Sequence, residues 1–228
     1  ALPISMHWTE YFPPLMEGAW VTIQLTLYST VLGAALAFVF GLGKLSRNLV
    51  IKSVSVAYIE VFRGTSLLVQ LFWLYFALPI AGMAIGIDLR LPPVLAGVLA
   101  LGLNIGAYGA EVVRGAVQSV HQDQHEAARA LNFTPRQTMW NITLPQAVPE
   151  MMPSFGNLAV QNLKDTALVS LISLGDLTFR AEQIRNFTQD STTIYSMLLL
   201  AYFGMALVLS AIMRALEGYV GRWRTARS

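Results

Sequence analysis

The sequence contains no cysteine, and only 12% of its 228 residues are charged. Without cysteine the chain can form neither disulfides nor thiolate metal sites. A soluble domain carries charge on roughly a quarter of its residues, so the charge content here is too low for one. Hydrophobic residues instead make up 55% of the chain. Together these proportions indicate one integral membrane domain and leave no room for an attached soluble catalytic domain.

Five stretches are apolar and long enough to be membrane-spanning helices, which need roughly 20 residues to cross a bilayer. The first, third and fifth carry almost no charge, whereas charged residues interrupt the second and fourth. They predict an all-α integral membrane fold with five transmembrane helices in a single domain over residues 1–228. The predicted spans cover residues 19–43, 53–82, 91–114, 151–175 and 191–213.

The stretch before the first predicted span mixes polar and aromatic residues. Pro13 and Pro14 should interrupt a helix there, and Trp8 and Tyr11 favour the membrane–water interface. We therefore expect residues 1–18 to lie along a membrane face. We also expect no cleavable signal sequence, because the stretch has neither a basic start nor a continuous apolar core.

Lysine and arginine are distributed unequally between the two sides of the predicted bundle. Ten of them lie on the side of the loop between the third and fourth spans, and three lie on the opposite side. By the positive-inside rule this distribution places that loop and the C-terminus in the cytoplasm and the N-terminus outside. The ten are residues 44, 47, 52, 114, 129, 136, 214, 222, 224 and 227, and the three are Arg90, Arg180 and Arg185.

The loop between the third and fourth spans, residues 118–146, is predicted to fold as a compact two-helix hairpin. Good helix formers fill residues 122–131, and Asp123 places a negative charge in the first turn, where it is favourable. Asn132 follows, one of the few non-glycine residues that tolerate the left-handed conformation ending a helix. Local sequence therefore predicts where the first helix of the hairpin begins and ends.

The second helix of the hairpin has an equally clear start. Thr134 suits the N-cap, Pro135 the first helical position, and Gln137 completes a capping box. The helix is expected to end at Leu144, because Pro145 disfavours helical conformation in the residue before it. A hairpin this well specified indicates a contact surface for another molecule. The alternative is an amphipathic connector resting on the lipid headgroups. Its apolar residues would be Leu131, Phe133, Trp140 and Ile142.

Charged residues in the fourth predicted span need an explanation, because each costs ~2.5–3.5 kcal/mol at bilayer depth on insertion scales. Lys164 and Asp165 are adjacent, so their side chains point about 100° apart on a helix and cannot both face lipid. Gln161 and Asn162 lie one turn earlier and extend this polar surface, which Thr166 follows. The surface is either the lining of a solute path or a structural ion pair between helices. A path with charges of both signs is compatible with a zwitterionic solute.

The second predicted span contains Glu60 and Arg63 at i,i+3 spacing. They either belong to the path or anchor the span at its cytoplasmic end. Gly64 and Thr65 follow, where the helix is expected to unwind locally, and Gln70 lies two turns beyond Arg63.

The third predicted span carries small residues at helical spacing, Gly102, Gly106 and Ala110. This pattern lets transmembrane helices approach closely. Because five helices hardly enclose a solute path, we expect this face to suit packing against a second subunit. Glu111 and Arg114, which end the span, are interpreted as a structural ion pair.

The hairpin contains a spaced motif of Glu126-Ala127-Ala128, then Asn132, then Ile142, Leu144 and Pro145. This motif resembles the EAA loop of bacterial ATP-binding-cassette importer permeases. The family has glycine where this chain has Asn132, and asparagine also adopts the left-handed turn. In that family the loop docks into a groove on the ATPase subunit, which implies that Glu126 makes a charged contact and that Ala127 and Ala128 let the helix seat. The coupling residues implied are Glu126, Ala127, Ala128, Arg129, Leu131, Asn132, Ile142, Leu144 and Pro145.

Two further stretches resemble motifs of the polar-amino-acid subfamily of these permeases. They are residues 62–70, with Ser66 where proline is usual, and residues 164–168 in the fourth span. With residues 104–108, the resemblance extends over nearly the whole chain. It implies that a path for a small polar zwitterion is lined by Arg63, Gln70, Gln161, Asn162, Lys164, Asp165 and Thr166.

Within that subfamily, residues 130–137 and 167–180 are similar to permeases of ectoine/hydroxyectoine importers. The resemblance therefore implies either ectoine or hydroxyectoine as the solute, or another polar amino acid. It also implies the fold of a type I importer permease in the bacterial cytoplasmic (inner) membrane.

The same resemblance implies a set of partners besides the lipid bilayer. A second permease subunit, identical or paralogous, would complete the path, and an extracytoplasmic solute-binding protein would deliver the solute. Two ATP-binding subunits, which carry ATP and Mg, would bind the hairpin and drive the change between outward- and inward-facing states. This chain itself is expected to bind no cofactor and no nucleic acid.

Two other functions are less compatible with the sequence. For a membrane enzyme, His121 and His125 have the i,i+4 spacing of metal ligands, but no third ligand lies nearby, so no metal is expected. No Gly-x-Ser-x-Gly elbow is present either, so no catalytic residues are expected. For an ion-driven carrier, the chain lacks the internal repeats common in that class. Residues 41–44 also lack the features of a phosphate loop, so the chain should not hydrolyse ATP alone.

Overall fold

The structure, a computed structural model, describes residues 8–225, and every regular element in that range is helical. This confirms the prediction of an all-α fold. Most elements are α-helices, whereas η1 and η2 are π-helices and η3 is a 3₁₀-helix. In chain order the elements are α1 (Trp8–Lys44), α2 (Leu49–Gly64), α3 (Leu67–Phe72), η1 (Trp73–Ala77), α4 (Leu78–Ala84), α5 (Pro93–Ser119), α6 (Gln122–Ala130), α7 (Pro135–Thr138), η2 (Met139–Thr143), α8 (Leu144–Asp165), η3 (Thr166–Ile172), α9 (Leu177–Thr188) and α10 (Ser191–Thr225).

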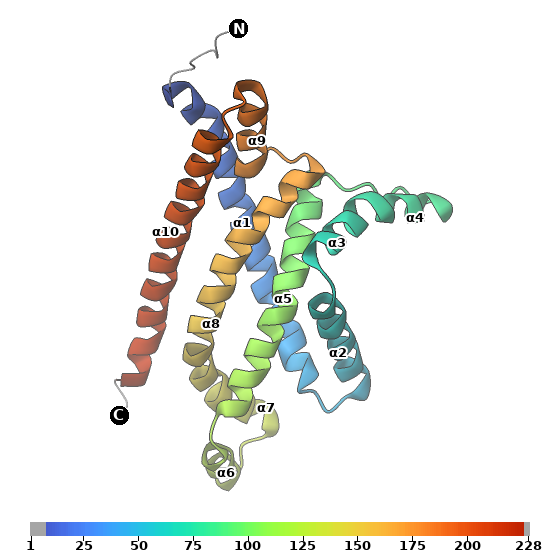
Figure 1. Cartoon of the computed structure of the whole chain (residues 1–228). Helices are drawn as coiled ribbons and strands as arrows, with labels where there is room; N and C mark the ends of the chain where they lie inside the picture. Colours follow the sequence, from blue (N-terminus) through green and yellow to red (C-terminus); the bar gives the residue numbers. More distant parts are fainter. Residues whose placement is uncertain (1–7, 226–228) are drawn as a thin grey trace.

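The long helices α1, α5, α8 and α10 run along the length of the molecule, as Figure 1 shows. The hairpin helices α6 and α7 lie at one end of this bundle, and α9 lies at the other end beside the start of α1. α2 packs near the hairpin end, and α3 and α4 project to one side. The hairpin and α9 are thus separated by the full length of the bundle.

Four segments of the described chain are long and apolar enough to cross a membrane: Tyr11–Lys44, Leu67–Ala84, Pro93–Ser119 and Ser191–Gly221. The predicted span 151–175 is not among them, because α8 carries several polar and charged residues, most of them exposed. It also does not form a single α-helix, since α8 gives way to η3 at Thr166. The count of five spans therefore stays a prediction.

The predicted span 53–82 is not one helix either. α2 ends at Gly64, and Thr65 and Ser66 adopt extended backbone conformations before α3 begins. Glycine is among the weakest helix formers, which favours an interruption at this point. The local unwinding expected near Gly64 is therefore confirmed, but it divides the span into two helices that point in different directions (Figure 1).

The first helix begins earlier than predicted. α1 includes Pro13 and Pro14 and runs without interruption from Trp8, so the prediction that these prolines prevent helix was wrong. Both lie in the second turn, where each proline removes one N–H donor, and the helix nevertheless continues to Lys44.

The core of the bundle is the packing of α1 against α5. Small residues on both helices allow this approach: Ala37 on α1 and Ala107 and Ala110 on α5 are fully buried. A Cβ placed on Gly106 would lie 2.9 Å from the Leu36 Cβ and 3.2 Å from the Gly33 carbonyl oxygen of α1. The small-residue face of the third span is therefore covered by α1 of the same chain, which corrects the expectation that it receives a second subunit.

Both π-helices precede a Leu-Pro pair. In η1 the N–H of Leu78 donates to the Trp73 carbonyl, five residues back, and in η2 the N–H of Leu144 donates to the Met139 carbonyl. Proline lacks an N–H and its ring clashes with the carbonyl four residues earlier. A π turn is wider and relieves that clash. Its backbone hydrogen bonds join residues five apart, and after it they return to the four-residue spacing of an α-helix. The chain therefore continues as a helix through Pro145, and the prediction that the second hairpin helix ends at Leu144 was wrong.

α9 is fixed to the N-terminal half of α1 beside a buried carboxylate. Asp176 is fully buried and caps α9, accepting hydrogen bonds from the N–H groups of Thr178 (3.2 Å) and Phe179 (3.0 Å). The Thr22 hydroxyl of α1 accepts from the N–H of Leu177 at 3.2 Å. Burial raises the pKa of Asp176 to about 6, and the two backbone donors oppose that rise. α9 is therefore a docked, capped helix rather than a free loop.

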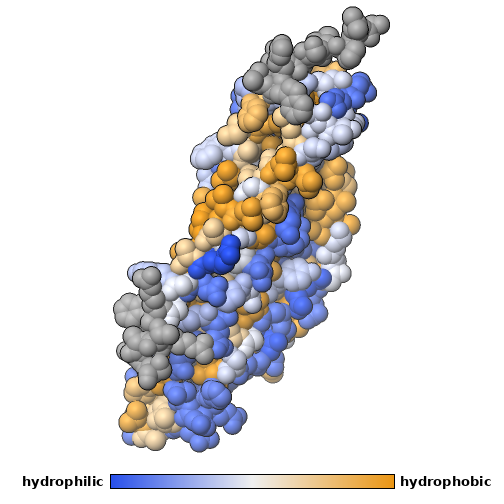
Figure 2. All heavy atoms as spheres, turned by 60° about the vertical axis from the view of Figure 1, so that its left-hand side comes forward, coloured by the Kyte–Doolittle hydropathy of each residue, from blue (hydrophilic) through white to orange (hydrophobic). Residues whose placement is uncertain are grey.

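α10 presents an apolar surface away from the core. Figure 2 shows hydrophobic residues gathered over the upper half of this side of the molecule and mainly hydrophilic residues toward the lower end. α10 has no buried residue in its most apolar 18-residue window. Its exposed apolar side chains include Leu199, Leu200, Phe203, Leu207, Val208 and Ile212.

Candidate functional site

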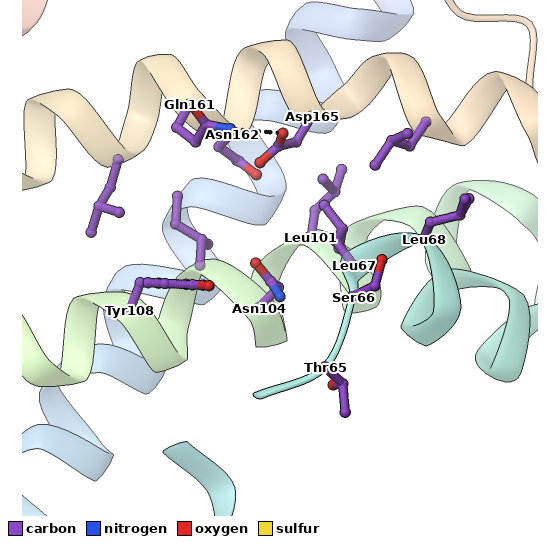
Figure 3. A pocket seen from close by; sticks show the side chains of 13 residues that line it. Thr65, Ser66, Leu67, Leu68, Leu101, Asn104, Tyr108, Gln161, Asn162 and Asp165 are labelled. Carbon is purple, nitrogen blue, oxygen red and sulfur yellow. Dashed lines mark hydrogen bonds between the residues drawn. The ribbon is translucent and has the colours of Figure 1, made fainter. Parts of the chain in front are cut away.

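A cavity of about 430 Å³ lies between the interruption of the second span, α5 and α8. Figure 3 shows side chains from these three elements pointing into the space between them. The polar and apolar lining residues are Thr65, Ser66, Leu67, Leu68, Leu101, Asn104, Ile105, Tyr108, Leu158, Gln161, Asn162, Asp165 and Leu168. The site therefore combines hydroxyl, amide and carboxylate groups on an otherwise apolar wall.

The α8 wall carries the negative charge of the cavity. Gln161 and Asp165 lie one turn apart, and the Gln161 amide nitrogen donates to the Asp165 Oδ1 at 2.9 Å (Figure 3). Asp165 is half-buried and Gln161 is exposed. The amide thus orients the carboxylate while the second carboxylate oxygen remains on the cavity side.

Asn162 fixes the same wall to α1. It is only 2% exposed, and its amide nitrogen donates to the hydroxyls of Ser29 (2.7 Å) and Thr30 (2.9 Å) and to the Thr26 carbonyl (3.4 Å). Buried polar groups are costly unless they are hydrogen-bonded, so these bonds specify one register between α8 and α1. They also keep the amide in place at the edge of the cavity.

The opposite wall is formed by the interruption of the second span and by α5. Thr65 and Ser66 are exposed to the cavity because neither belongs to a helix. Tyr108 of α5 is stacked by Arg63, whose guanidinium carbon lies 5.4 Å from the ring centroid. Arg63 makes no ion pair with Glu60, its i,i+3 neighbour, among the described residues.

The structure brings three of the seven predicted path residues to the cavity: Gln161, Asn162 and Asp165. Arg63 contacts it only through Tyr108, and Lys164 is exposed outside the lining. The other two are buried: Thr166 donates to the Leu163 carbonyl at 2.6 Å, and Gln70 lies behind the wall. The path role of these four stays a prediction.

Four polar lining residues were not among the predicted path residues: Thr65, Ser66, Asn104 and Tyr108. Asn104 carried a usable signal, since it is a polar residue in an otherwise uncharged span. Thr65 and Ser66 carried a second signal, because the helix was expected to unwind beside them. Backbone groups without helical hydrogen bonds are tolerated at membrane depth only where they line a cavity or are buried in protein.

The hairpin has the local geometry expected from its sequence. Asn132 adopts a left-handed conformation with φ of 59°, and the N–H of Phe133 donates to the Ala128 carbonyl at 2.9 Å. Thr134 and Gln137 form the predicted capping box, with a Thr134 N–H to Gln137 Oε1 distance of 2.8 Å. Both ends of the turn are therefore hydrogen-bonded, as predicted.

The predicted coupling residues differ in exposure. Most of them are exposed and available to a partner: Glu126, Ala127, Arg129, Leu131, Asn132 and Pro145. Ala128 is fully buried and Leu144 belongs to a core cluster, so both pack within the chain, while Ile142 is half-buried. Of the apolar residues in the lipid-connector alternative, Leu131 and Trp140 are 69% and 59% exposed, whereas Phe133 and Ile142 are half-buried.

One face of α6 is polar and mostly exposed. Gln122, His125, Glu126 and Arg129 lie at helical spacing and border a hollow of about 300 Å³. Within the part of the chain that the structure describes, no group of three or more His, Cys, Asp or Glu side chains lies close enough to hold a metal. The face offers charges of both signs for contact with a partner.

Side-chain contacts join the two helices that flank the hairpin, α5 and α8, and also join α5 to α1. The Ser119 hydroxyl at the end of α5 donates to the Glu150 Oε2 of α8 at 2.8 Å. About two turns further into the bundle, Glu111 pairs with Arg114 at 2.8 Å and with Lys44 of α1. The predicted Glu111–Arg114 pair is therefore confirmed, and it also connects α5 to α1.

Comparison with known proteins extends over the whole fold. The family model of the binding-protein-dependent transport system inner membrane component matches residues 24–222. A probable amino-acid ABC transporter permease protein of Sinorhizobium fredii is 66% identical over 224 residues, which is 98% of this chain and 94% of that protein.

Two further relatives are more distant. The glutamine transport system permease protein of Escherichia coli is 35% identical over 217 residues, covering 94% of this chain and 97% of that protein. The L-cystine transport system permease protein of Bacillus subtilis is 31% identical over 225 residues, covering 98% and 93%.

Solved structures share the same fold. An amino acid ABC transporter crystallised with histidines superposes with a TM-score of 0.83 and 36% identity, covering 92% of this chain and 96% of that one. The methionine ABC transporter in an inward-facing conformation superposes with a TM-score of 0.72, covering 94% and 99%, at 18% identity. The second likeness concerns the fold alone.

Proposed function

The chain belongs to the family of inner membrane components of binding-protein-dependent transport systems, and on this basis we propose that it is the permease subunit of an ATP-binding-cassette importer for amino acids. Members of this family are transporter subunits rather than enzymes. The proposal of an amino-acid substrate is supported by the relatives that are named for amino acid, glutamine and cystine transport. No relative named above supports the suggestion of ectoine, which is kept as one solute to test.

The observation that carries the substrate class is the chemistry of the cavity. Its volume of about 430 Å³ falls in the range of small-molecule sites. Asp165 would accept charge-assisted hydrogen bonds from the ammonium group of an amino acid. The hydroxyls of Ser66 and Tyr108, on the other walls, would donate to its carboxylate or side chain, and the amide oxygen of Asn104 would accept from a polar group of the solute. A zwitterion fits this arrangement better than an ion of one charge.

Transport tests the function directly. The chain, reconstituted in liposomes with its partner ATPase and solute-binding protein, should take up amino acid only when ATP is supplied. Competition by L-glutamine, L-cystine, ectoine and hydroxyectoine would rank the solutes. Uptake by the chain without an ATPase would contradict the proposal and favour an ion-driven carrier.

Asp165→Asn should lower the rate of uptake about tenfold or more in that assay. The substitution preserves shape but removes the negative charge that would bind the ammonium group, and loss of one charged hydrogen bond corresponds to roughly 1.5–3 kcal/mol. Lys164→Met is the matched comparison, because Lys164 is adjacent in sequence but lies outside the cavity lining. If Lys164→Met reduces uptake and Asp165→Asn does not, the solute passes on the other side of α8.

The partners and the orientation belong to the same proposal. A second permease subunit would enclose the path, two ATP-binding subunits carrying ATP and Mg would contact the hairpin, and a solute-binding protein would dock at the α9 end. The family assigns the chain to the inner membrane. The charge distribution supports a cytoplasmic hairpin and C-terminus and an external N-terminus.

The absence of native cysteine makes the orientation measurable. Asn186→Cys in α9 should react with a membrane-impermeant maleimide in spheroplasts, in which the outer membrane no longer blocks the reagent. Arg136→Cys in α7 should react only after the inner membrane is permeabilised. Both residues are exposed, so burial does not limit either reaction. Reaction of the α7 cysteine in sealed spheroplasts would reverse the proposed topology.

A further inference from the structure

Two amide side chains meet behind the cavity, where the second span is interrupted. Gln70 of α3 is 91% buried, since only 9% of its surface is exposed, and it does not line the cavity. Its amide nitrogen donates to the Phe62 carbonyl (2.9 Å), the Thr65 carbonyl (3.2 Å) and the Thr65 hydroxyl (2.7 Å). Its amide oxygen accepts from the Asn104 amide nitrogen at 3.1 Å.

These bonds replace backbone bonds that the interruption removes. The last four carbonyls of a helix have no intrahelical donor. In a continuous helix the Phe62 carbonyl would accept from the N–H of Ser66, but Ser66 is extended. Here it accepts from Gln70 and also from Asn104 at 3.1 Å. The Thr65 hydroxyl in turn donates to the Val61 carbonyl at 2.7 Å.

The interruption and the cavity share residues. Thr65 and Ser66 form the wall at the break, and Asn104 both lines the cavity and bonds to the Phe62 carbonyl. Any change in the conformation of residues 62–66 would therefore move part of the wall. Gln70 is the group that contacts the break and Asn104 together, without contacting the cavity itself.

We propose that Gln70 is a positioning residue, which holds the interrupted second span in the shape that gives the transport site its affinity for the solute. The inference rests on the proposed function of the cavity and assigns Gln70 a place behind the site instead of in the path. Glutamine is suited to this task because it offers two N–H donors and a carbonyl acceptor at once. Glutamate, of the same size, offers no donor to the two carbonyls when ionised.

The test measures binding by the permease–ATPase complex without the solute-binding protein, which would otherwise dominate the affinity. The complex is heated with and without an excess of L-glutamine, L-cystine or ectoine, whichever is transported in the uptake assay. A ligand that binds the folded complex raises its melting temperature by mass action. Gln70→Glu and Gln70→Met should weaken binding about tenfold and shrink this shift, while each ligand-free complex remains assembled.

Val69→Ala is the control, because Val69 is the neighbouring residue, is 60% exposed and lies outside the cavity lining. A merely structural role would lower the ligand-free melting temperature of the Gln70 variants but leave the ligand-induced shift intact, and that result would overturn the inference. Should Gln70→Met fail to assemble, Gln70→Glu decides by itself, since it preserves volume. A wild-type complex that transports solute but shows no ligand-induced shift would refute the role of Gln70 and leave the importer function standing.

Discussion

Replacing Gly41 with leucine should prevent the chain from accumulating as folded protein in the membrane. Gly41 lies on α1 where the helix crosses α5, and a Cβ there would lie 2.7 Å from the Ala110 carbonyl oxygen and 2.8 Å from the Val113 Cβ. Neither atom is the mobile end of a side chain, so the two helices would have to separate. Overpacking costs typically 1–3 kcal/mol even where side chains can adjust, and total stability is only about 5–15 kcal/mol.

Gly204→Leu is the matched control for this prediction. Gly204 lies in the middle of α10, and a Cβ there would meet nothing within 4 Å. Thermal unfolding of the detergent-solubilised chains should give a melting temperature near that of the unsubstituted protein for Gly204→Leu and a large decrease, or no folded protein, for Gly41→Leu. Equal melting temperatures for the two variants would mean that α1 and α5 are not packed as described.

Features that depend on a few neighbouring residues could be predicted from the sequence. The left-handed Asn132 and the Thr134–Gln137 capping box were predicted, because each requires only backbone groups within a few positions. The Glu111–Arg114 pair was predictable for the same reason. Its third member, Lys44, was not, since it comes from a helix 67 residues away in the sequence.

Helix ends that depend on the rest of the fold were predicted less well. Pro145 normally ends a helix, but a π turn at residues 139–143 carries the chain past it, and η1 does the same before Pro79. The cost of such a turn is offset by packing of the continuing helix: Leu144, Ala147 and Met151 of α8 join one core cluster. Local preference indicates a break, and tertiary packing determines whether the break forms.

The candidate site shows the same division. Sequence composition identified polar residues at membrane depth, but not the direction in which each one points. Gln161, Asn162 and Asp165 face the cavity, whereas Lys164 does not. Gln70 was grouped with the path because of its polarity, and only the three-dimensional arrangement shows it bonded to the helix interruption. These residues differ in where they lie relative to other helices, and the neighbouring residues in the sequence do not determine that position.

Glu126→Arg should leave the chain in the membrane but lower ATP-driven uptake at least tenfold, while the ATPase subunits still hydrolyse ATP. Glu126 is exposed on the polar face of α6, with Gln122, His125 and Arg129 beside it. Reversal of a charge at a contact with the ATPase would cost several kcal/mol where like charges are brought together, and 1.4 kcal/mol corresponds to a factor of ten. Uptake and ATP hydrolysis are measured on the same proteoliposomes. Full uptake by the variant would refute the coupling role of the hairpin.

The two alanines beside Glu126 distinguish a contact surface from a structural element. Ala127→Leu adds volume to an exposed position, so it should preserve the melting temperature but block seating on the ATPase and reduce uptake. Ala128→Leu adds the same volume to a fully buried position, so it should lower the melting temperature as well. The hairpin follows α5 directly in the chain, and the Gln146 amide of α8 donates to Gln124 of α6 at 3.4 Å. A hairpin with intact folding but a blocked face would therefore still be attached to the helices that form the cavity walls, but the ATPase would no longer drive it. If Ala127→Leu transports normally while Ala128→Leu does not, the exposed face of α6 contacts lipid rather than an ATPase.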